Sequence, residues 1–220
     1  MDFGRSFSYI TEDEGWITKI LIAGVLLLTG IGGIVVAGWF AEIIRRVAND
    51  DANPLPDWSD FGGYAVEGLK IIGLVLVWAL PIILLLVCNS VITFAATSLG
   101  GGDTAEIMTT VALVANFCVI GLVLIYAILM ALLIPASISI LATGGSFGDA
   151  LRQAFPTFRA NIGGFLLAAI VGSLVVSILS TVGIILCVVG TYLGLAFGYA
   201  VQGHLFGQAY KAAKAALPAG

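Results

Sequence analysis

Residues 71–98 read IIGLVLVWALPIILLLVCNSVITFAATS, a long run without a single charged side chain. A helix needs roughly 20 predominantly apolar residues to cross the hydrocarbon core of a bilayer, so this run predicts a membrane-spanning helix. The whole chain has the same character, because 60% of its 220 residues are hydrophobic and only 10% are charged. Soluble domains contain about 25% charged residues. We therefore expect an integral membrane protein that forms one transmembrane domain over residues 1–220.

The apolar residues fall into five stretches, which predict an all-α, polytopic helical bundle. The last two stretches are contiguous and too long for one crossing, so we place a break near Gly183, where Ser180 and Thr181 also weaken the pattern. We expect four full crossings after a first stretch of ambiguous topology, with short interfacial helices between them. The stretches are approximately residues 17–44, 70–98, 107–141, 161–182 and 183–207.

The first stretch, 17–44, is compatible with two topologies. As one helix it would be about 42 Å long, which suits a single tilted crossing. Its middle, TGIGG at residues 29–33, can instead form a tight turn between two half-helices. Such a re-entrant hairpin is tolerated in a membrane only where protein covers its backbone. The stretch is therefore either a fifth crossing or a re-entrant hairpin.

The basic residues indicate the orientation of the bundle. Segments 45–69 and 144–160 and the C-terminal tail contain Lys or Arg or border one, whereas the loop 99–106 contains none. Cytoplasmic loops of membrane proteins are enriched in these two residues. We expect 45–69 and 144–160 to be cytoplasmic interfacial segments, and the loop 99–106 to face the other side.

One turn-rich segment, NPLPDWSDFGGY at residues 53–64, interrupts the apolar pattern. Its prolines stop a preceding helix, and Trp58 and Phe61 are of the type found at the membrane–water boundary. Asp57 and Asp60 can cap the turn or the following helix. The segment is interpreted as an interfacial elbow, with a docking surface for another protein or a calcium site as alternatives.

A second interfacial segment is expected at SFGDALRQAFPTF, residues 146–158. Ser146 and Asp149 have the spacing of a capping box, and Phe155 follows at helical spacing with Arg152 among the polar positions. This pattern is typical of a short helix that lies in the membrane interface.

The two interfacial segments are predicted to pack together. Both are expected on the cytoplasmic face, and one supplies acidic side chains where the other supplies Arg152. Exposed ion pairs contribute only about 0–1 kcal/mol, so aromatic burial would have to stabilise the contact. We expect Trp58 to lie near Phe155 or Phe158.

Small residues recur every four positions near the end of the chain, at Gly190, Gly194 and Gly198. This spacing lets helix backbones approach closely in lipid. The row is interpreted as packing within the final helical pair, with dimerisation or docking of a partner helix as alternatives.

Polar side chains within the apolar stretches are few. Asn89 and Asn116 lie in adjacent predicted crossings and can face each other. His204 is the single histidine and is interpreted as an interfacial residue, since no second histidine exists to share a metal. No nucleophile–base pair, phosphate-binding loop, metal-ligand cluster or nucleic-acid footprint stands out. We expect no enzyme activity, no cofactor, no metal site and no nucleic-acid partner.

Four segments carry a resemblance to a known family: MDFGRSFSYITEDEGW at the start, LPDWSDFG, GSFGDALRQAF and GHLFGQAYK. Together they resemble an uncharacterised prokaryotic membrane family known as DUF4013. The resemblance covers essentially the whole chain and brings no activity, cofactor or substrate with it. It implies a multi-pass protein of the prokaryotic cytoplasmic membrane.

These observations favour a non-catalytic membrane scaffold, assembly factor or accessory subunit that acts through helix packing. Its expected partners are the lipid bilayer and other membrane subunits, or a second copy of itself. A small channel or facilitator for a neutral or lipid-like solute is the alternative, with intramembrane polar side chains along the path. An intramembrane lipid-modifying enzyme is disfavoured, because such chemistry needs carboxylates or histidines near the interface.

Overall fold

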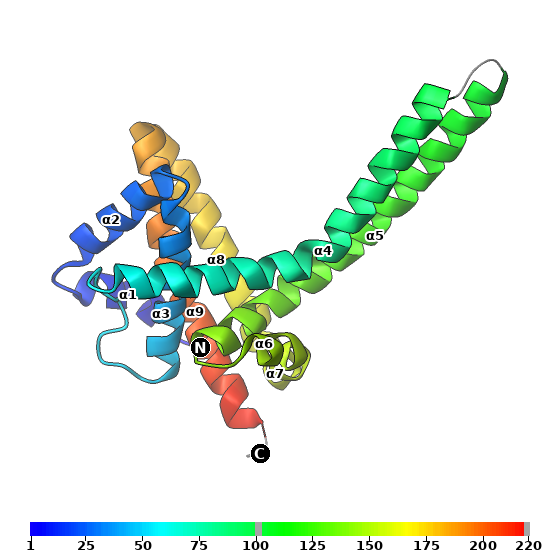
Figure 1. The fold of residues 1–220 in the computed structure, drawn as a ribbon. Coiled ribbons are helices and arrows are strands. Elements are labelled where there is room, and N and C mark those ends of the chain that lie inside the picture. Colours follow the sequence, from blue (N-terminus) through cyan, green and yellow to red (C-terminus); the bar gives the residue numbers. More distant parts are fainter. Residues whose placement is uncertain (100–102, 218–220) are drawn as a thin grey trace. The chain divides into compact units, whose positions relative to one another are not determined.

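The computed structural model describes residues 1–99 and 103–217, and this part of the chain is all-α (Figure 1). The predicted fold class is confirmed at that level. Side chains of residues 99, 103–105 and 186 lie outside the description, as do residues 100–102 of the predicted loop 99–106. The helices are α1 Phe3–Glu12, α2 Trp16–Leu28, α3 Gly32–Ala48, α4 Phe61–Leu99, α5 Asp103–Ala142, α6 Phe147–Arg152, α7 Ala154–Ala160, α8 Ile162–Gly183, the 3₁₀ turn η1 Ile184–Leu186, and α9 Cys187–Ala216.

The chain forms two compact units. The first, here called the bundle unit, comprises Met1–Leu74 together with Leu132–Gly220. The second, here called the hairpin unit, is Val75–Ala131, which contains most of α4 and α5. Each unit is described separately below.

Three described helices are long and apolar enough to cross a membrane: Phe61–Ser98, Glu106–Ala142 and Ile162–Gly183. They account for the predicted stretches 70–98, 107–141 and 161–182. Most of the stretch 183–207 lies in α9, after the 3₁₀ turn η1, and α9 is not among the three. Polar side chains such as Gln202 and His204 lower the hydropathy of this helix.

The first apolar stretch is not one continuous helix. Helix α2 ends at Leu28, and a second helix, α3, begins at Gly32. Gly30 adopts φ +70° in the intervening turn, a conformation that glycine reaches without steric cost. With 13 residues, α2 is only about 20 Å long. This length is shorter than the roughly 30 Å hydrocarbon core of a bilayer.

Helix α9 is the central element of the bundle unit. It contacts α8 most extensively, and also α3, α2, α1 and α7. Its residues Val201 and Leu205 are fully buried, as are Trp39 on α3 and Phe165 on α8. The chain breaks between α8 and α9 after Gly183, where the sequence predicted it. The core of the bundle unit therefore forms around the most polar of the long helices.

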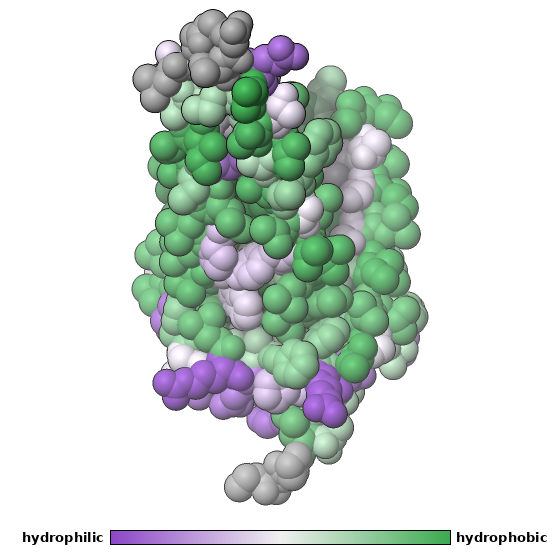
Figure 2. Space-filling model, turned by 90° about the vertical axis from the view of Figure 1, so that its right-hand side faces the viewer, coloured by the Kyte–Doolittle hydropathy of each residue, from purple (hydrophilic) through white to green (hydrophobic). Residues whose placement is uncertain are grey.

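The hairpin unit is held by polar contacts inside a strongly apolar surface. The Asn89 side-chain amide donates to Asn116 Oδ1 at 3.3 Å, which confirms that these residues face each other. The Tyr126 hydroxyl donates to the Trp78 carbonyl at 2.9 Å. Large apolar side chains are exposed along both legs, among them Leu84, Val91, Phe94, Phe117 and Ile125. Figure 2 shows a face that is coloured mainly hydrophobic.

The segment after α5 contains two short helices instead of the expected one. The capping box is present: the Ser146 hydroxyl accepts from the Asp149 N–H, and the Asp149 carboxylate accepts from the Ser146 N–H. Helix α6 nevertheless ends at Arg152 and α7 begins at Ala154. Pro156 has no N–H to donate to the Arg152 carbonyl, so the helix cannot continue across this point.

Candidate functional site

Trp58 and Trp39 connect the turn-rich segment to the bundle. Their rings stack with centroids 5.3 Å apart and an interplanar angle of 12°. Trp39 is fully buried on α3, and its Nε1–H donates to the Pro56 carbonyl at 3.0 Å. The Trp58 Nε1–H donates to the Lys19 carbonyl on α2, also at 3.0 Å. The segment is thus attached by hydrogen bonds to both α2 and α3, the helices of the first apolar stretch.

Lys19 and Tyr64 complete this attachment. The Lys19 ammonium forms an ion pair with Asp13 at 2.6 Å and donates to the Leu55 carbonyl at 3.0 Å. The Tyr64 hydroxyl donates to the Asp57 carbonyl at 2.8 Å. Each contact satisfies a polar group that burial would otherwise leave without a partner.

The two aspartates of the segment stabilise its own turns. Asp57 accepts from the Ser59 hydroxyl at 2.5 Å and from the Ser59 N–H at 3.1 Å. These hydrogen bonds hold the pKa of the Asp57 carboxyl below its usual value. Asp60 accepts from the Gly63 N–H at 2.9 Å in the first turn of α4. Within residues 1–99 and 103–217, no three His, Cys, Asp or Glu side chains form a group able to hold a metal.

The prediction that Trp58 packs near Phe155 or Phe158 is wrong. The rings around Trp58 are those of Trp39, Phe61 and Tyr64. Phe158 instead contacts Phe165, and Phe155 is 57% exposed. Trp39 lies close to the segment in the chain, its ring is buried, and its hydrogen bond to the Pro56 carbonyl holds the segment beside it.

Arg152 and Phe155 both lie on exposed or half-exposed surface. The carboxylates of Asp57 and Asp60 are engaged with Ser59 and Gly63, as described above. The structure therefore places Arg152 and Phe155 at the interfacial segment and brings neither to the turn-rich segment.

The glycine row lies against α8. A Cβ built at Gly194 would overlap the Leu179 carbonyl oxygen. One built at Gly198 would lie 2.8 Å from the Val176 Cα. Gly190 is buried, and its carbonyl oxygen would overlap a Cβ built at Gly183. The missing side chains allow the backbones of α8 and α9 to approach to a distance that any larger residue would prevent.

His204 is buried against α1 and is not a surface residue. The Asp2 N–H donates to Gln208 Oε1 at 2.7 Å, which fixes the orientation of that side-chain amide. Gln208 Nε2 is therefore the donor in its 2.9 Å contact with His204 Nδ1. An imidazole whose Nδ1 accepts a hydrogen bond is neutral. The Tyr9 ring stacks on it at 4.5 Å, so this histidine attaches the N-terminal helix to α9.

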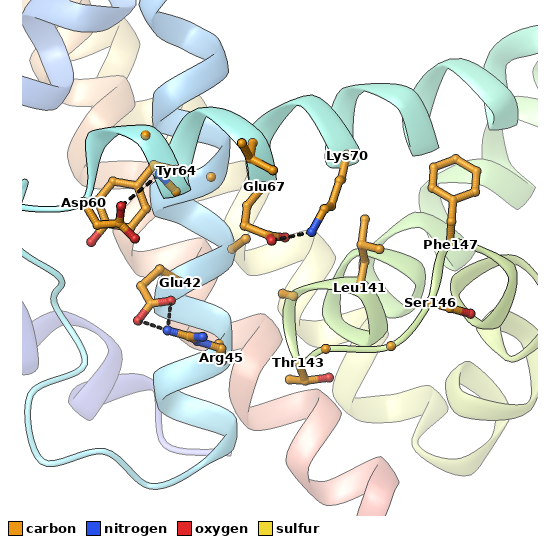
Figure 3. A pocket seen from close by; sticks show the side chains of 18 residues that line it. Glu42, Arg45, Asp60, Tyr64, Glu67, Lys70, Leu141, Thr143, Ser146 and Phe147 are labelled. Atoms are coloured by element: carbon orange, nitrogen blue, oxygen red, sulfur yellow. Dashed lines mark hydrogen bonds and ion pairs between the residues drawn. The ribbon is translucent and has the colours of Figure 1, made fainter.

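A cleft of about 740 Å³ opens in the bundle unit (Figure 3). Its walls are the end of α3, the first turns of α4, and the loop from α5 to α6. Gly144, with φ +93°, forms the turn in this loop. The charged side chains that line the cleft are Glu42, Arg45, Asp60, Glu67 and Lys70.

The charges in this cleft form short ion pairs. Glu42 contacts Arg45 at 2.6 Å and Arg46 at 2.8 Å, so one carboxylate serves two guanidinium groups. Hydrogen bonding to Glu42 raises the pKa of Arg45. Glu67 and Lys70 pair at 2.6 Å one turn apart on α4. The side chains of Arg45, Glu67 and Lys70 are 55%, 40% and 49% exposed, respectively. The pairs therefore remain accessible to a ligand.

Two features of this region were missed from the sequence. The cleft combines three segments that lie far apart in the chain, and no motif marks it. The close crossing of α3 and α4 was also missed: a Cβ at Gly38 would overlap the Tyr64 backbone, and one at Gly68 would overlap the Ile34 carbonyl oxygen. The available signal was the presence of isolated glycines in both segments.

The fold defines the class of the protein: an all-α chain with three helices of membrane-spanning length and composition, as expected of a multi-pass membrane protein. Within this class, the chain belongs to the family described as "Protein of unknown function (DUF4013)", whose model matches residues 21–188. The resemblance seen in the sequence is thereby confirmed over these residues. The turn-rich segment and the capping box lie inside the matched region. Neither a curated protein nor a solved structure matches the chain.

Proposed function

We propose that the protein is a non-catalytic scaffold or accessory subunit of a membrane complex and that the hairpin unit contacts another membrane subunit. The observation that carries the proposal is the organisation of the chain into a bundle unit with a tightly packed core and a separate hairpin unit with exposed apolar legs. The glycine contacts between α8 and α9 stabilise the bundle unit internally. A partner helix is the occupant that would pack against the exposed phenylalanines of the hairpin legs.

Affinity purification after extraction in a mild detergent tests this function. We expect a stoichiometric membrane partner to co-purify with the tagged protein. Phe94→Ala combined with Phe117→Ala should reduce its recovery by about tenfold, since aromatic side chains contribute strongly at interfaces. These side chains are 72% and 74% exposed. The matched control is Ile170→Ala on α8, which is 60% exposed and should leave recovery unchanged. Purification as a lone monomer after cross-linking in native membranes would contradict the proposal.

The proposed topology places four crossings in a prokaryotic cytoplasmic membrane, with α2 and α3 as a re-entrant hairpin. The turn between these helices and the short length of α2 support this arrangement. Both termini and segments 45–69 and 144–160 would then be cytoplasmic, in agreement with the distribution of basic residues. Helix α9 would be the fourth crossing, shielded by the helices that surround it.

Single-cysteine labelling in intact cells tests this topology. In a variant without native cysteines, we expect Glu106→Cys to react with a membrane-impermeant thiol reagent. Gly4→Cys and Lys214→Cys should react only after the cells are lysed. All three positions are exposed on the protein surface. Labelling of Gly4→Cys from outside would instead place the N-terminus there and make the first stretch a fifth crossing.

A further inference from the structure

The cleft lined by Glu42, Arg45, Asp60, Glu67 and Lys70 has a charge pattern that suits one class of ligand. It offers two cationic and three anionic side chains within one opening. Arg46, which does not line the cleft, also pairs with Glu42 and brings the local charge close to balance. A purely anionic or purely cationic ligand would leave half of these groups facing a like charge. A zwitterion satisfies both signs.

The cleft also contains apolar wall. Val66, Leu141 and Phe147 line it beside the charged groups. Phe147 is 37% exposed and Val66 is 54% exposed. A ligand that fills this space therefore needs an apolar part next to its charges.

The position of the cleft along the membrane-spanning helices also favours a ligand with both charged and apolar parts. Its lining includes the first turns of the span Phe61–Ser98 and the last residues of the span Glu106–Ala142. Helix α4 has 39 residues and is about 58 Å long, whereas the hydrocarbon core is about 30 Å thick. The helix is therefore longer than the core, and its charged first turns, with Glu67 and Lys70, are the part suited to the headgroup region.

We propose that this cleft binds the headgroup of a zwitterionic phospholipid with a primary amine, such as phosphatidylethanolamine. The phosphate would contact Arg45 and Lys70, and the ammonium group would contact Glu67 and Asp60. A primary ammonium fits these carboxylates because it donates hydrogen bonds, whereas a quaternary choline has no N–H to donate. Exchange of partners is inexpensive, because exposed ion pairs contribute little to stability. The acyl chains would leave along Val66 and Phe147.

Native mass spectrometry of the detergent-purified full chain, titrated with individual lipids, tests the site. We expect phosphatidylethanolamine to bind about tenfold more tightly than phosphatidylcholine or phosphatidylglycerol, because each of the latter lacks one charge-assisted contact. Soluble glycerophosphoethanolamine should bind more weakly than the lipid. If it binds equally well, the headgroup chemistry stands and the ligand is a free solute.

Variants locate the site within the protein. Arg45→Gln combined with Lys70→Gln should weaken phosphatidylethanolamine binding by about tenfold, and Glu67→Gln should remove the preference over phosphatidylglycerol. Lys214→Gln, an exposed charge on α9 outside the cleft, is the matched control and should change neither. Unaltered binding in folded cleft variants, or a preference for phosphatidylglycerol in the natural protein, would overturn the proposal.

Discussion

Gly194→Leu is expected to lower the free energy of unfolding by about 3 kcal/mol, the upper part of the range for overpacking a core. The cause is steric: the first atom of any side chain at this position meets the Leu179 carbonyl oxygen of α8. Because that obstacle is backbone, relief requires α8 and α9 to separate along their shared face. Unfolding in mixed detergent micelles, followed by tryptophan fluorescence, measures the change.

Gly163→Leu is the matched control for this experiment. It introduces the same side chain near the start of α8, where a Cβ would have nothing within 4 Å. We expect a change within about 0.5 kcal/mol, as for other surface substitutions. If both variants lose equal stability, the cost comes from placing leucine in these helices and the packing explanation fails.

The elements that could be predicted from the sequence depend on local patterns. The lengths of the apolar runs predicted the three spans, because the bilayer sets a minimum length. The break after Gly183 followed from small and polar residues there, and the Ser146–Asp149 capping box followed from a three-residue spacing. The contact between Asn89 and Asn116 followed from their placement in adjacent antiparallel crossings.

The apolar stretch predicted at residues 70–98 covers only part of α4. The apolar run begins at residue 70, yet α4 begins at Phe61. Glu67 and Lys70 form a pair three residues apart on one helical face, which supports a helix and does not end it. Where the helix runs outside the hydrocarbon, hydropathy no longer reports its extent.

The partner of Trp58 could not be predicted, because it depends on how α3 packs against the turn-rich segment. Trp39 lies in the apolar stretch 17–44, where the sequence does not distinguish it from the other large apolar side chains. The structure shows its role: the Trp39 ring stacks on Trp58, and its Nε1–H donates to the Pro56 carbonyl. The charged cleft could not be predicted for the same reason, since its residues come together only through the crossing of α3 and α4 at Gly38.

Trp39→Ala is expected to be the most damaging substitution around the turn-rich segment, with a loss of about 3–5 kcal/mol in the free energy of unfolding. It removes a fully buried ring and leaves the Pro56 carbonyl without its donor. Trp58→Ala should cost less, because Trp58 is only partly buried. Asp60→Asn should cost least, since asparagine caps a helix about as well as aspartate.

Comparison of Trp39→Phe with Trp39→Ala separates the two contributions. Phenylalanine keeps most of the apolar ring but cannot donate to Pro56, so its cost should be close to that of one hydrogen bond, about 1 kcal/mol. In a double-mutant cycle, Trp39→Ala and Trp58→Ala should show a coupling energy of about 0.5–1.5 kcal/mol from the stacked rings. Additive effects, or a Trp39→Ala midpoint equal to that of Asp60→Asn, would mean that the segment is held by the membrane surface or a partner and not by its attachment to α2 and α3.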